Sequence, residues 1–416
     1  MQGKQYKRRR ESNNFSLISF FRLESTHRDR KEISQKMSSC MRGILVTNYG
    51  NPDVLQLRKD LKYPKLGPDQ IIIKVRACAI TSEDVFVRSG GHKQLSANVT
   101  LNNGINNVNS CNELPYTPGT EISGFVEEVG SNVKKFNIGD RVYTFSGLIS
   151  GGSAQFSLCD PKHTFKLPEC LTFRQGCVLG LNYFTAYTAI IKEKYGNISP
   201  GQNVCISCPW NSPVLIPLIQ VAFASGAGKI FVLRNCRKSV DDENEYGNEY
   251  SEPPYALKNP QENTIERLIL SQVDETLNVL EIVNITSLNK STKIDLLIDS
   301  QANVSLNKIL RNITPKSGKI ILLQSNNLSL SNSVIDNFLF EYFISNEITL
   351  KGLNINNVKF NLSEQDRIEI SLQLYRWVNY GFISPCPGKE FPMDQVIDGH
   401  RYQLVESGPY NSVLII

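Results

Sequence analysis

Apolar and polar positions alternate along the chain from Met41 to about Leu167, as expected for β-strands. The strongest strand is residues 70–80, QIIIKVRACAI, and residues 115–145 contain further strands separated by glycines. A short helix follows the strand at 70–80, with Thr81 or Ser82 as its N-cap. This part of the chain therefore predicts an antiparallel, β-rich domain.

After Leu167 the pattern changes to helices that alternate with short, wholly apolar strands. The strands are predicted at residues 203–207, 229–235, 293–300 and 318–325. Strands that are apolar on both faces are typical of a parallel sheet covered by helices on each side. The prediction is an α/β fold whose doubly wound parallel sheet forms a nucleotide-binding (Rossmann) domain.

These changes of pattern divide the chain into four predicted parts. They are a basic, disordered leader (1–40), a β-rich catalytic domain (41–167), a nucleotide-binding domain (168–354) and a C-terminal segment that returns to the first domain (355–416). An Asn-rich insertion at 92–113 interrupts the β-rich domain, and an acidic insertion at 239–263 interrupts the nucleotide-binding domain.

Charge is concentrated in the leader. Residues 1–40 contain ten basic and four acidic side chains, so the remaining chain has a net charge of −1 against a total of +5. The basic run at 6–10 could contact RNA or act as an import signal. Alternatively, the leader is disordered or absent from the mature protein, which would then begin at Met37 or Met41.

Two further features of the sequence, its apolar runs and its cysteines, bear on the cellular compartment and on contact with membranes. No apolar run approaches the roughly 20 residues of a membrane-spanning helix, and no secretory signal is evident. The ten cysteines form no disulfide framework, which predicts reduced thiols in a cytoplasmic protein without membrane contact.

Residues 205–220, CISCPWNSPVLIPLIQ, lie between a predicted strand and a predicted helix, where a dinucleotide-binding domain has its glycine-rich loop. No glycine is present. Ser212 is predicted as the N-cap and Pro213 as the first helical residue, so the helix N-terminus would remain available to an anion. Asn211 and Ser212 are therefore candidate cofactor-binding residues. However, Pro213 and Pro217 have no N–H, and we expect Trp210 to occupy space needed by phosphate oxygens.

Several motifs resemble one family. They are MRGILVTNYGNPDVLQL, LPYTPGTEISGFVEEVGSNVKKFNIGDRVYT, ISGGSAQFSL, LPECLTFRQGCVLGLNYFTAYTAI and GFISPCPGKEFPMDQVIDGHRYQLVESG. Together they resemble the zeta-crystallin type of NADPH:quinone oxidoreductase, in the zinc-free branch of the medium-chain dehydrogenases/reductases. The resemblance implies a GroES-like catalytic domain, a Rossmann domain, a quinone or enone substrate and a homo-oligomer. It extends over nearly all of the chain from Met41 except the two insertions.

The resemblance also allows a zinc site to be tested. Zinc-dependent relatives place a cysteine and a histidine where this chain has Thr81 and Thr120, and threonine is not a usual zinc ligand. The only CxxC, Cys205 and Cys208, lies on a predicted strand and turn with no second pair. We therefore expect no zinc.

Matching motifs imply further cofactor-binding residues and no catalytic side chain. Thr185 would lie near the nicotinamide amide, and Leu353 would contribute backbone to its carboxamide. Asn303 and Ser325 would line the cofactor groove. Arg234, with Arg237 and Lys238, follows the second strand, where a 2′-phosphate of NADPH would be held, although surface charge explains these residues equally well.

One departure concerns the short helix after residue 81. A family tyrosine in this helix is replaced by Phe86, which removes a hydroxyl facing the cofactor or substrate.

Three functional hypotheses remain open from the sequence. The chain could be an NADPH-dependent quinone or enone reductase that transfers hydride in the interdomain cleft. It could be a pseudoenzyme of the same fold with weakened cofactor binding, acting as a scaffold. It could also bind RNA, as zeta-crystallins are associated with AU-rich RNA.

Overall fold

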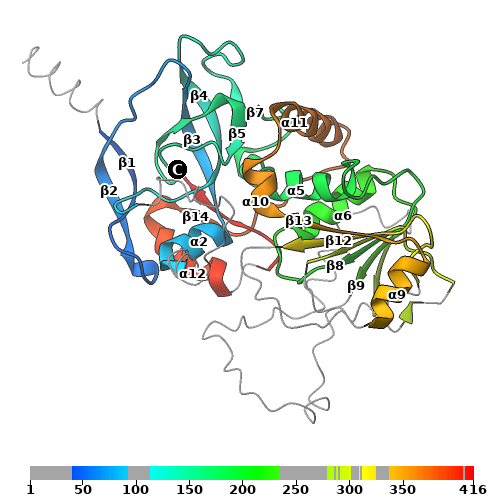
Figure 1. The fold of residues 1–416 in the computed structure, drawn as a ribbon. Coiled ribbons are helices and arrows are strands. Elements are labelled where there is room, and N and C mark those ends of the chain that lie inside the picture. Colours follow the sequence, from blue (N-terminus) through cyan, green and yellow to red (C-terminus); the bar gives the residue numbers. More distant parts are fainter. Residues whose placement is uncertain are drawn as a thin grey trace, which may run out of the picture.

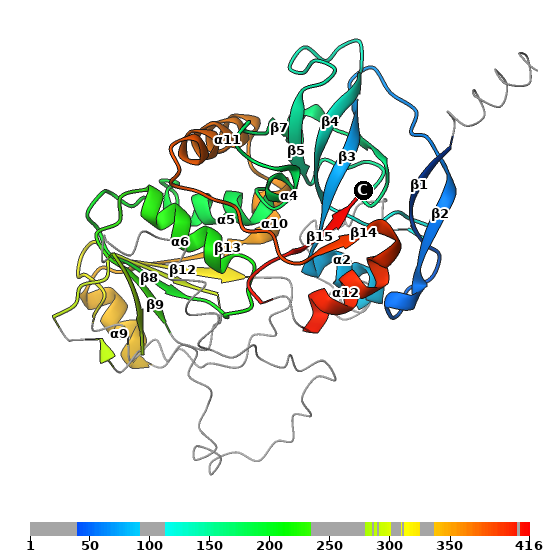
Figure 2. The same cartoon turned by 180° about the vertical axis from the view of Figure 1, so that it is seen from behind.

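A computed structural model describes residues 40–91, 113–233, 279–284, 287–288, 291–300, 309, 312–324, 337–405 and 408–416. The predicted basic leader lies outside the described residues except for Cys40, which begins the first strand. The acidic insertion and all of the Asn-rich insertion except Glu113 also lie outside them. Figures 1 and 2 show two lobes, each built around one sheet.

The first lobe contains a seven-stranded sheet and a separate hairpin. The hairpin pairs β1 (Cys40–Val46) with β2 (Leu55–Lys62), and a 3₁₀ turn at Pro52–Val54 lies between them. The sheet has the order β14-β15-β3-β4-β5-β7, and β6 pairs with β3. Its strands are β3 (Ile71–Ile80), β4 (Glu121–Val129), β5 (Arg141–Phe145), β6 (Phe156–Cys159), β7 (Thr164–Lys166), β14 (Glu390–Pro392) and β15 (Ser412–Ile415).

Helix α2 (Ser82–Ser89) begins directly after β3, and its start is fixed by side chains. Of the two predicted candidates, Thr81 is the N-cap: its hydroxyl accepts a bond from Asp84 N, while the Asp84 carboxylate accepts one from Thr81 N. The helix ends at Gly90, whose φ of 85° places it in the left-handed region that glycine adopts without strain. The cap thus holds Glu83 and Asp84 at the first turn.

The second lobe contains a six-stranded sheet in which every pair is parallel. Its order is β10-β9-β8-β11-β12-β13, in which the first strand lies at the centre and the order reverses between β8 and β11. The strands are β8 (Val204–Ser207), β9 (Ile230–Leu233), β10 (Leu280–Val283), β11 (Leu296–Asp299), β12 (Lys319–Gln324) and β13 (Thr349–Asn354). The predicted doubly wound nucleotide-binding fold is confirmed.

Helices cover both faces of this sheet. One face packs against α5 (Leu181–Ile190) and α6 (Leu215–Ala224), and the other packs against α9 (Asn337–Ser345). The helical segment predicted before β8 is two helices, because α4 (Phe173–Gly176) ends before α5 begins. Alternate strand residues therefore contribute to two separate cores, as a doubly wound sheet requires.

The C-terminal segment joins the two lobes. Helices α10 (Ile355–Phe360) and α11 (Glu364–Asn379) pack against α5 on the nucleotide-binding lobe. The chain then passes through a 3₁₀ turn at Met393–Gln395 and α12 (Val396–Val405), and β15 pairs antiparallel with β3. Helix α10 lies close to the boundary between the lobes (Figure 1).

Candidate functional site

A pocket lies where α2, the turn at 116–120 and the loop after β5 meet α10. The first three belong to the lobe with the mixed sheet, and α10 packs on the nucleotide-binding lobe. The pocket has a volume of about 50 Å³, which is room for a few water molecules.

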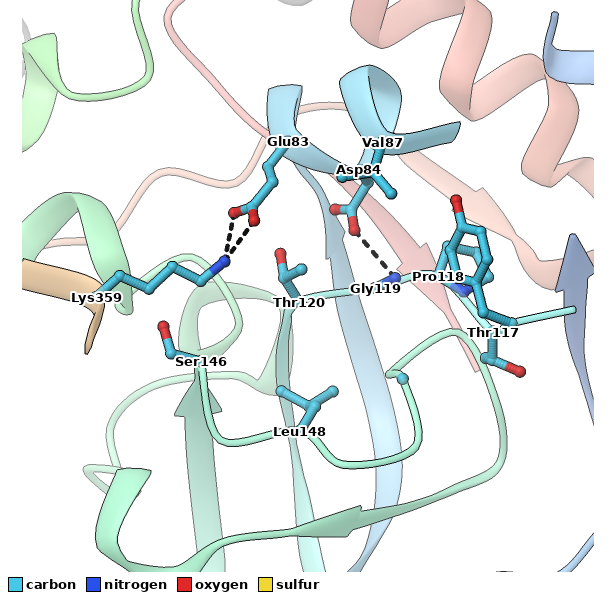
Figure 3. A pocket seen from close by; sticks show the side chains of 12 residues that line it. Glu83, Asp84, Val87, Thr117, Pro118, Gly119, Thr120, Ser146, Leu148 and Lys359 are labelled. Carbon is cyan, nitrogen blue, oxygen red and sulfur yellow. Dashed lines mark hydrogen bonds and ion pairs between the residues drawn. The ribbon is translucent and has the colours of Figure 1, made fainter. Parts of the chain in front are cut away.

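An ion pair crosses this boundary. Lys359 of α10 lies with its Nζ 2.5 Å and 2.6 Å from the two carboxylate oxygens of Glu83 in α2 (Figure 3). Lys359 is only 4 % exposed, whereas the Glu83 side chain is 26 % exposed. Glu83 therefore provides most of the stabilisation that water would otherwise give the charged ammonium group.

Two further carboxyl groups lie buried beside this pair. Burial raises the pKa of Asp84 to about 6, although hydrogen bonds from Thr81 and from Gly119 N oppose the shift. Burial, with repulsion from Asp84, raises the pKa of Glu121 to about 8. Near neutral pH, Glu121 is therefore mostly uncharged.

Two hydroxyl groups that line the pocket have no hydrogen-bond partner in the protein. They are Ser146 Oγ and Tyr116 Oη, both buried. Ser146 also has a φ of 59°, which non-glycine residues adopt uncommonly. Strained backbone and unpaired buried hydroxyls cluster at ligand-binding and catalytic sites.

Thr81 and Thr120, the two positions where the family resemblance would place zinc ligands, lie together. Their hydroxyl oxygens are 3.4 Å apart. Among the described residues, no group of three or more histidine, cysteine, aspartate or glutamate side chains could hold a metal ion. Cys205 and Cys208 pack in different cores on opposite sides of the parallel sheet, so their thiols do not meet.

The segment between β8 and α6 differs from two predictions. Ser212 is not an N-cap: α6 begins at Leu215, its N-cap is Val214, and no side chain caps it. The reason is a turn before the helix, in which Ser212 N donates to Pro209 O and Leu215 N donates to Ser212 O. Trp210 is 7 % exposed and packs in the core between the parallel sheet and α6. Its burial contradicts our expectation that the indole occupies the space for phosphate.

The carboxyl ends of β8 and β11 meet at the point where the strand order reverses. Ser207 Oγ donates to Asp299 Oδ1 over 3.0 Å, and Ser300 N donates to Ser207 O over 2.8 Å. Both side chains of the first bond are buried. In doubly wound folds, this reversal point is where nucleotides bind.

Three buried polar atoms in this lobe lack protein partners and provide a test of fit to a dinucleotide. They are Thr185 Oγ1, Trp210 Nε1 and Ser300 Oγ. Ser300 directly follows β11 at the strand reversal, and an unpaired buried hydroxyl there fits a polar ligand such as a nicotinamide dinucleotide. The loop between β8 and α6 offers few backbone N–H groups to a dinucleotide, because three of residues 208–217 are prolines and none is glycine.

The remaining predicted cofactor residues have different positions. Thr185 lies in α5 and is fully buried, so a cofactor would reach it only after neighbouring groups move. Asn211 and Ser212 lie half-buried in the turn before α6, and Leu353 lies in β13 with its side chain in the core. Arg234, Asn303 and Ser325 lie outside the described residues.

The most informative pocket residues were absent from the sequence-based candidates. Glu83 and Lys359 are 276 positions apart, and nothing in the local pattern pairs them. Ser146 has no glycine or asparagine signal for its left-handed backbone. Phe86 was singled out instead, but Val87 of the same helix lines the pocket, and the Phe86 ring lies against Gly91.

No helix among the described residues is both long enough and apolar enough to span a bilayer.

Comparisons with known proteins agree with this architecture. Residues 67–169 match the family described as the alcohol dehydrogenase GroES-like domain. The quinone oxidoreductase of Homo sapiens is 27% identical over 380 residues, covering 90% of this chain and 98% of the relative. That of Rattus norvegicus is 26% identical over 386 residues, covering 90% and 98%.

Solved structures show the same fold. The native structure of a mycobacterial quinone oxidoreductase aligns with a TM-score of 0.68 at 18% identity, covering 90% of this chain and 100% of the other. A mycobacterial structure complexed with NADPH aligns with a TM-score of 0.63 at 18% identity and the same coverage.

Proposed function

We propose that the chain belongs to the quinone oxidoreductase family of the medium-chain dehydrogenases/reductases and is a zinc-independent, NADPH-dependent reductase of quinones or enones, because curated relatives of that name match 90% of the chain. The substrate class is taken from the names of its relatives. The reaction would occur at the lobe boundary, where the pocket at Lys359 lies.

One observation carries the proposal: the pocket is polar, buried and made by both lobes. Glu83 and Asp84 come from the first lobe and Lys359 comes from the helix that packs on the nucleotide-binding lobe. Hydride transfer requires the donor and acceptor to be held together away from water. A pocket at this boundary, beside a doubly wound sheet, provides such a place.

NADPH would supply the hydride when bound. Thr185, Ser300 and Leu353 would hold its nicotinamide end, and Asn211 and Ser212 would lie near its pyrophosphate. Arg234, Asn303 and Ser325 remain predicted contacts. The chain's own contribution is to orient the acceptor and to exclude water.

A second candidate has support from the loop between β8 and α6. The prolines at 209, 213 and 217 remove N–H groups from the region that usually binds pyrophosphate. A pseudoenzyme with weakened NADPH binding, serving as a scaffold, is therefore the alternative. The RNA-binding hypothesis depends chiefly on the basic leader, which lies outside the described residues.

We also propose a cytoplasmic homo-oligomer. Among the described strands, β13 pairs only with β12, so it forms one edge of the parallel sheet. Pairing of this edge with the same edge of a second copy would satisfy its free backbone groups.

The test is consumption of NADPH in the presence of a panel of quinones and enones, with NADH as a comparison. We expect acceptor-dependent oxidation of NADPH. Absence of turnover with every acceptor, together with absence of NADPH binding by calorimetry, would favour the pseudoenzyme.

A further inference from the structure

We propose that Ser146 and Lys359 bind the oxygen atom of the electron acceptor and stabilise the negative charge that this oxygen gains during reduction. This inference deepens the proposed function and rests on it. It assigns the two residues to acceptor binding, and it restricts the substrate to compounds whose reduced form carries an oxyanion.

Ser146 provides a hydrogen-bond donor that the protein does not use. Its hydroxyl is buried, has no partner, and points into the space below the Lys359–Glu83 pair (Figure 3). Leaving a buried hydroxyl unpaired costs free energy, and its left-handed backbone adds a further cost. Both costs are explained if the hydroxyl donates to a ligand.

Lys359 provides positive charge at the same place. An ammonium group has three N–H donors, and the two contacts with Glu83 can occupy two of them. Its side chain is 4 % exposed, so its field is weakly screened by water. Among the described residues that line the pocket, Lys359 is the only cationic side chain.

Each carboxylate near Lys359 has hydrogen-bond partners of its own. Glu83 pairs with Lys359, and the Asp84 carboxylate is stabilised by hydrogen bonds from Thr81 N, Thr81 Oγ1 and Gly119 N. Glu121 is mostly protonated near neutral pH because its pKa is about 8. The pocket therefore has one ammonium and one hydroxyl directed at an acceptor oxygen.

The chemistry balances with the proposed cofactor. One hydride brings two electrons and one hydrogen to the acceptor carbon, and the carbonyl π electrons move to oxygen. The oxygen becomes an enolate oxygen, and in a quinone the ring carbon that received the hydride then passes a proton through solvent to the second carbonyl oxygen, which leaves an aromatic phenolate. Ser146 Oγ and Lys359 Nζ hold this oxyanion until a proton from solvent completes the product. Donors placed where charge develops lower the barrier more than they strengthen substrate binding.

The experiment compares Ser146→Ala, Lys359→Met and Lys359→Arg with two control variants outside the pocket. The controls are Ser89→Ala and Lys134→Met, whose polar atoms bond to the backbone at Phe86 O and Ser131 O. If Ser146→Ala does not fold, Ser146→Gly removes the same hydroxyl and suits the φ of 59°. Two readouts are measured: quinone reduction with NADPH, and binding of 4-nitrophenol without NADPH.

Nitrophenol is an informative probe because its phenolate is coloured and mimics the oxyanion. We expect the wild-type protein to increase the ionised fraction of the bound probe, and Lys359→Met to abolish that increase. Ser146→Ala should weaken phenolate binding about 10-fold, and each substitution should lower kcat about 100-fold. Lys359→Arg should recover part of both effects, and the controls should behave as wild type.

The outcomes separate the two proposals. Wild-type turnover that Ser146→Ala and Lys359→Met leave unchanged would overturn the role of these residues and leave the reductase proposal intact. Probe ionisation that depends on both residues, without any turnover, would support the oxyanion site and argue against the reductase. Unchanged probe binding in both variants would also overturn the site.

Discussion

Lys359 and Glu83 form an ion pair in which the lysine is the more deeply buried partner. Replacing Glu83 should therefore lower the free energy of unfolding more than replacing Lys359. At 2.5 Å the gross attraction of two unit charges is about 7 kcal/mol for an effective dielectric constant of 20. Most of it is offset by the desolvation of Lys359. If only Glu83 is removed, the desolvation cost of Lys359 is no longer offset, because the ammonium stays buried.

Glu83→Gln should therefore lower the free energy of unfolding by about 3 kcal/mol, near the lower end of the range for a broken buried pair. The lower end applies because Glu83 is 26 % exposed and water replaces part of the contact. Lys359→Met should cost only about 1 kcal/mol, since the remaining carboxylate can turn to solvent. The double variant should be more stable than Glu83→Gln alone.

Urea denaturation of the four proteins, followed by both fluorescence and circular dichroism, measures these differences. Coincident transitions from the two probes are required for a two-state treatment. A loss in Lys359→Met equal to or larger than that in Glu83→Gln would refute the reasoning. So would additivity of the two single losses, because it would mean that the residues do not interact.

Three further predictions concern the buried groups and the loop. The folded-state pKa of Glu121, about 8, lies above its ordinary value of 4.5, so the wild type should lose several kcal/mol as pH rises from about 5 to 8. In Glu121→Gln the urea midpoint should change less between pH 5, 6.5 and 8 than in the wild type. An unchanged pH dependence would contradict the raised pKa of Glu121. Trp210→Phe removes an indole N–H that has no partner, so it should change the free energy of unfolding by no more than about 1 kcal/mol, and a loss above about 3 kcal/mol would show that the N–H is bonded. Pro217→Ala restores an N–H at the third helical position of α6 and should tighten NADPH binding up to about 10-fold by calorimetry, whereas unchanged affinity would place the pyrophosphate elsewhere.

The fold could be predicted because its signals are local. Apolar strands such as β8 and β11 are short, continuous runs that alternate with longer helical segments, so the pattern along the chain indicates them. The start of α2 could also be predicted to within one residue, since Thr81 and Ser82 are both good N-cap residues and acidic residues follow them. Propensity and burial agree in these segments.

The site was harder to predict because its features are not local. Ser212 followed by Pro213 has the local chemistry of a helix start, but a turn closed by Pro209 O delays α6 to Leu215. Burial of Trp210 in the core likewise depends on α6 and the parallel sheet together. Lys359 reaches Glu83 only because the C-terminal segment returns to the lobe boundary, and no pattern near either residue indicates this contact.

Binding of NADPH and transfer of its hydride to an acceptor at the lobe boundary can be tested in one titration. Tryptophan fluorescence of a Trp377→Phe variant, titrated with NADPH, reports on Trp210 alone, because the chain has two tryptophans. The account predicts a saturable fluorescence change that reverses when a quinone is added and NADPH is consumed. No saturable change and no NADPH consumption, in a variant that is folded by circular dichroism, would contradict it.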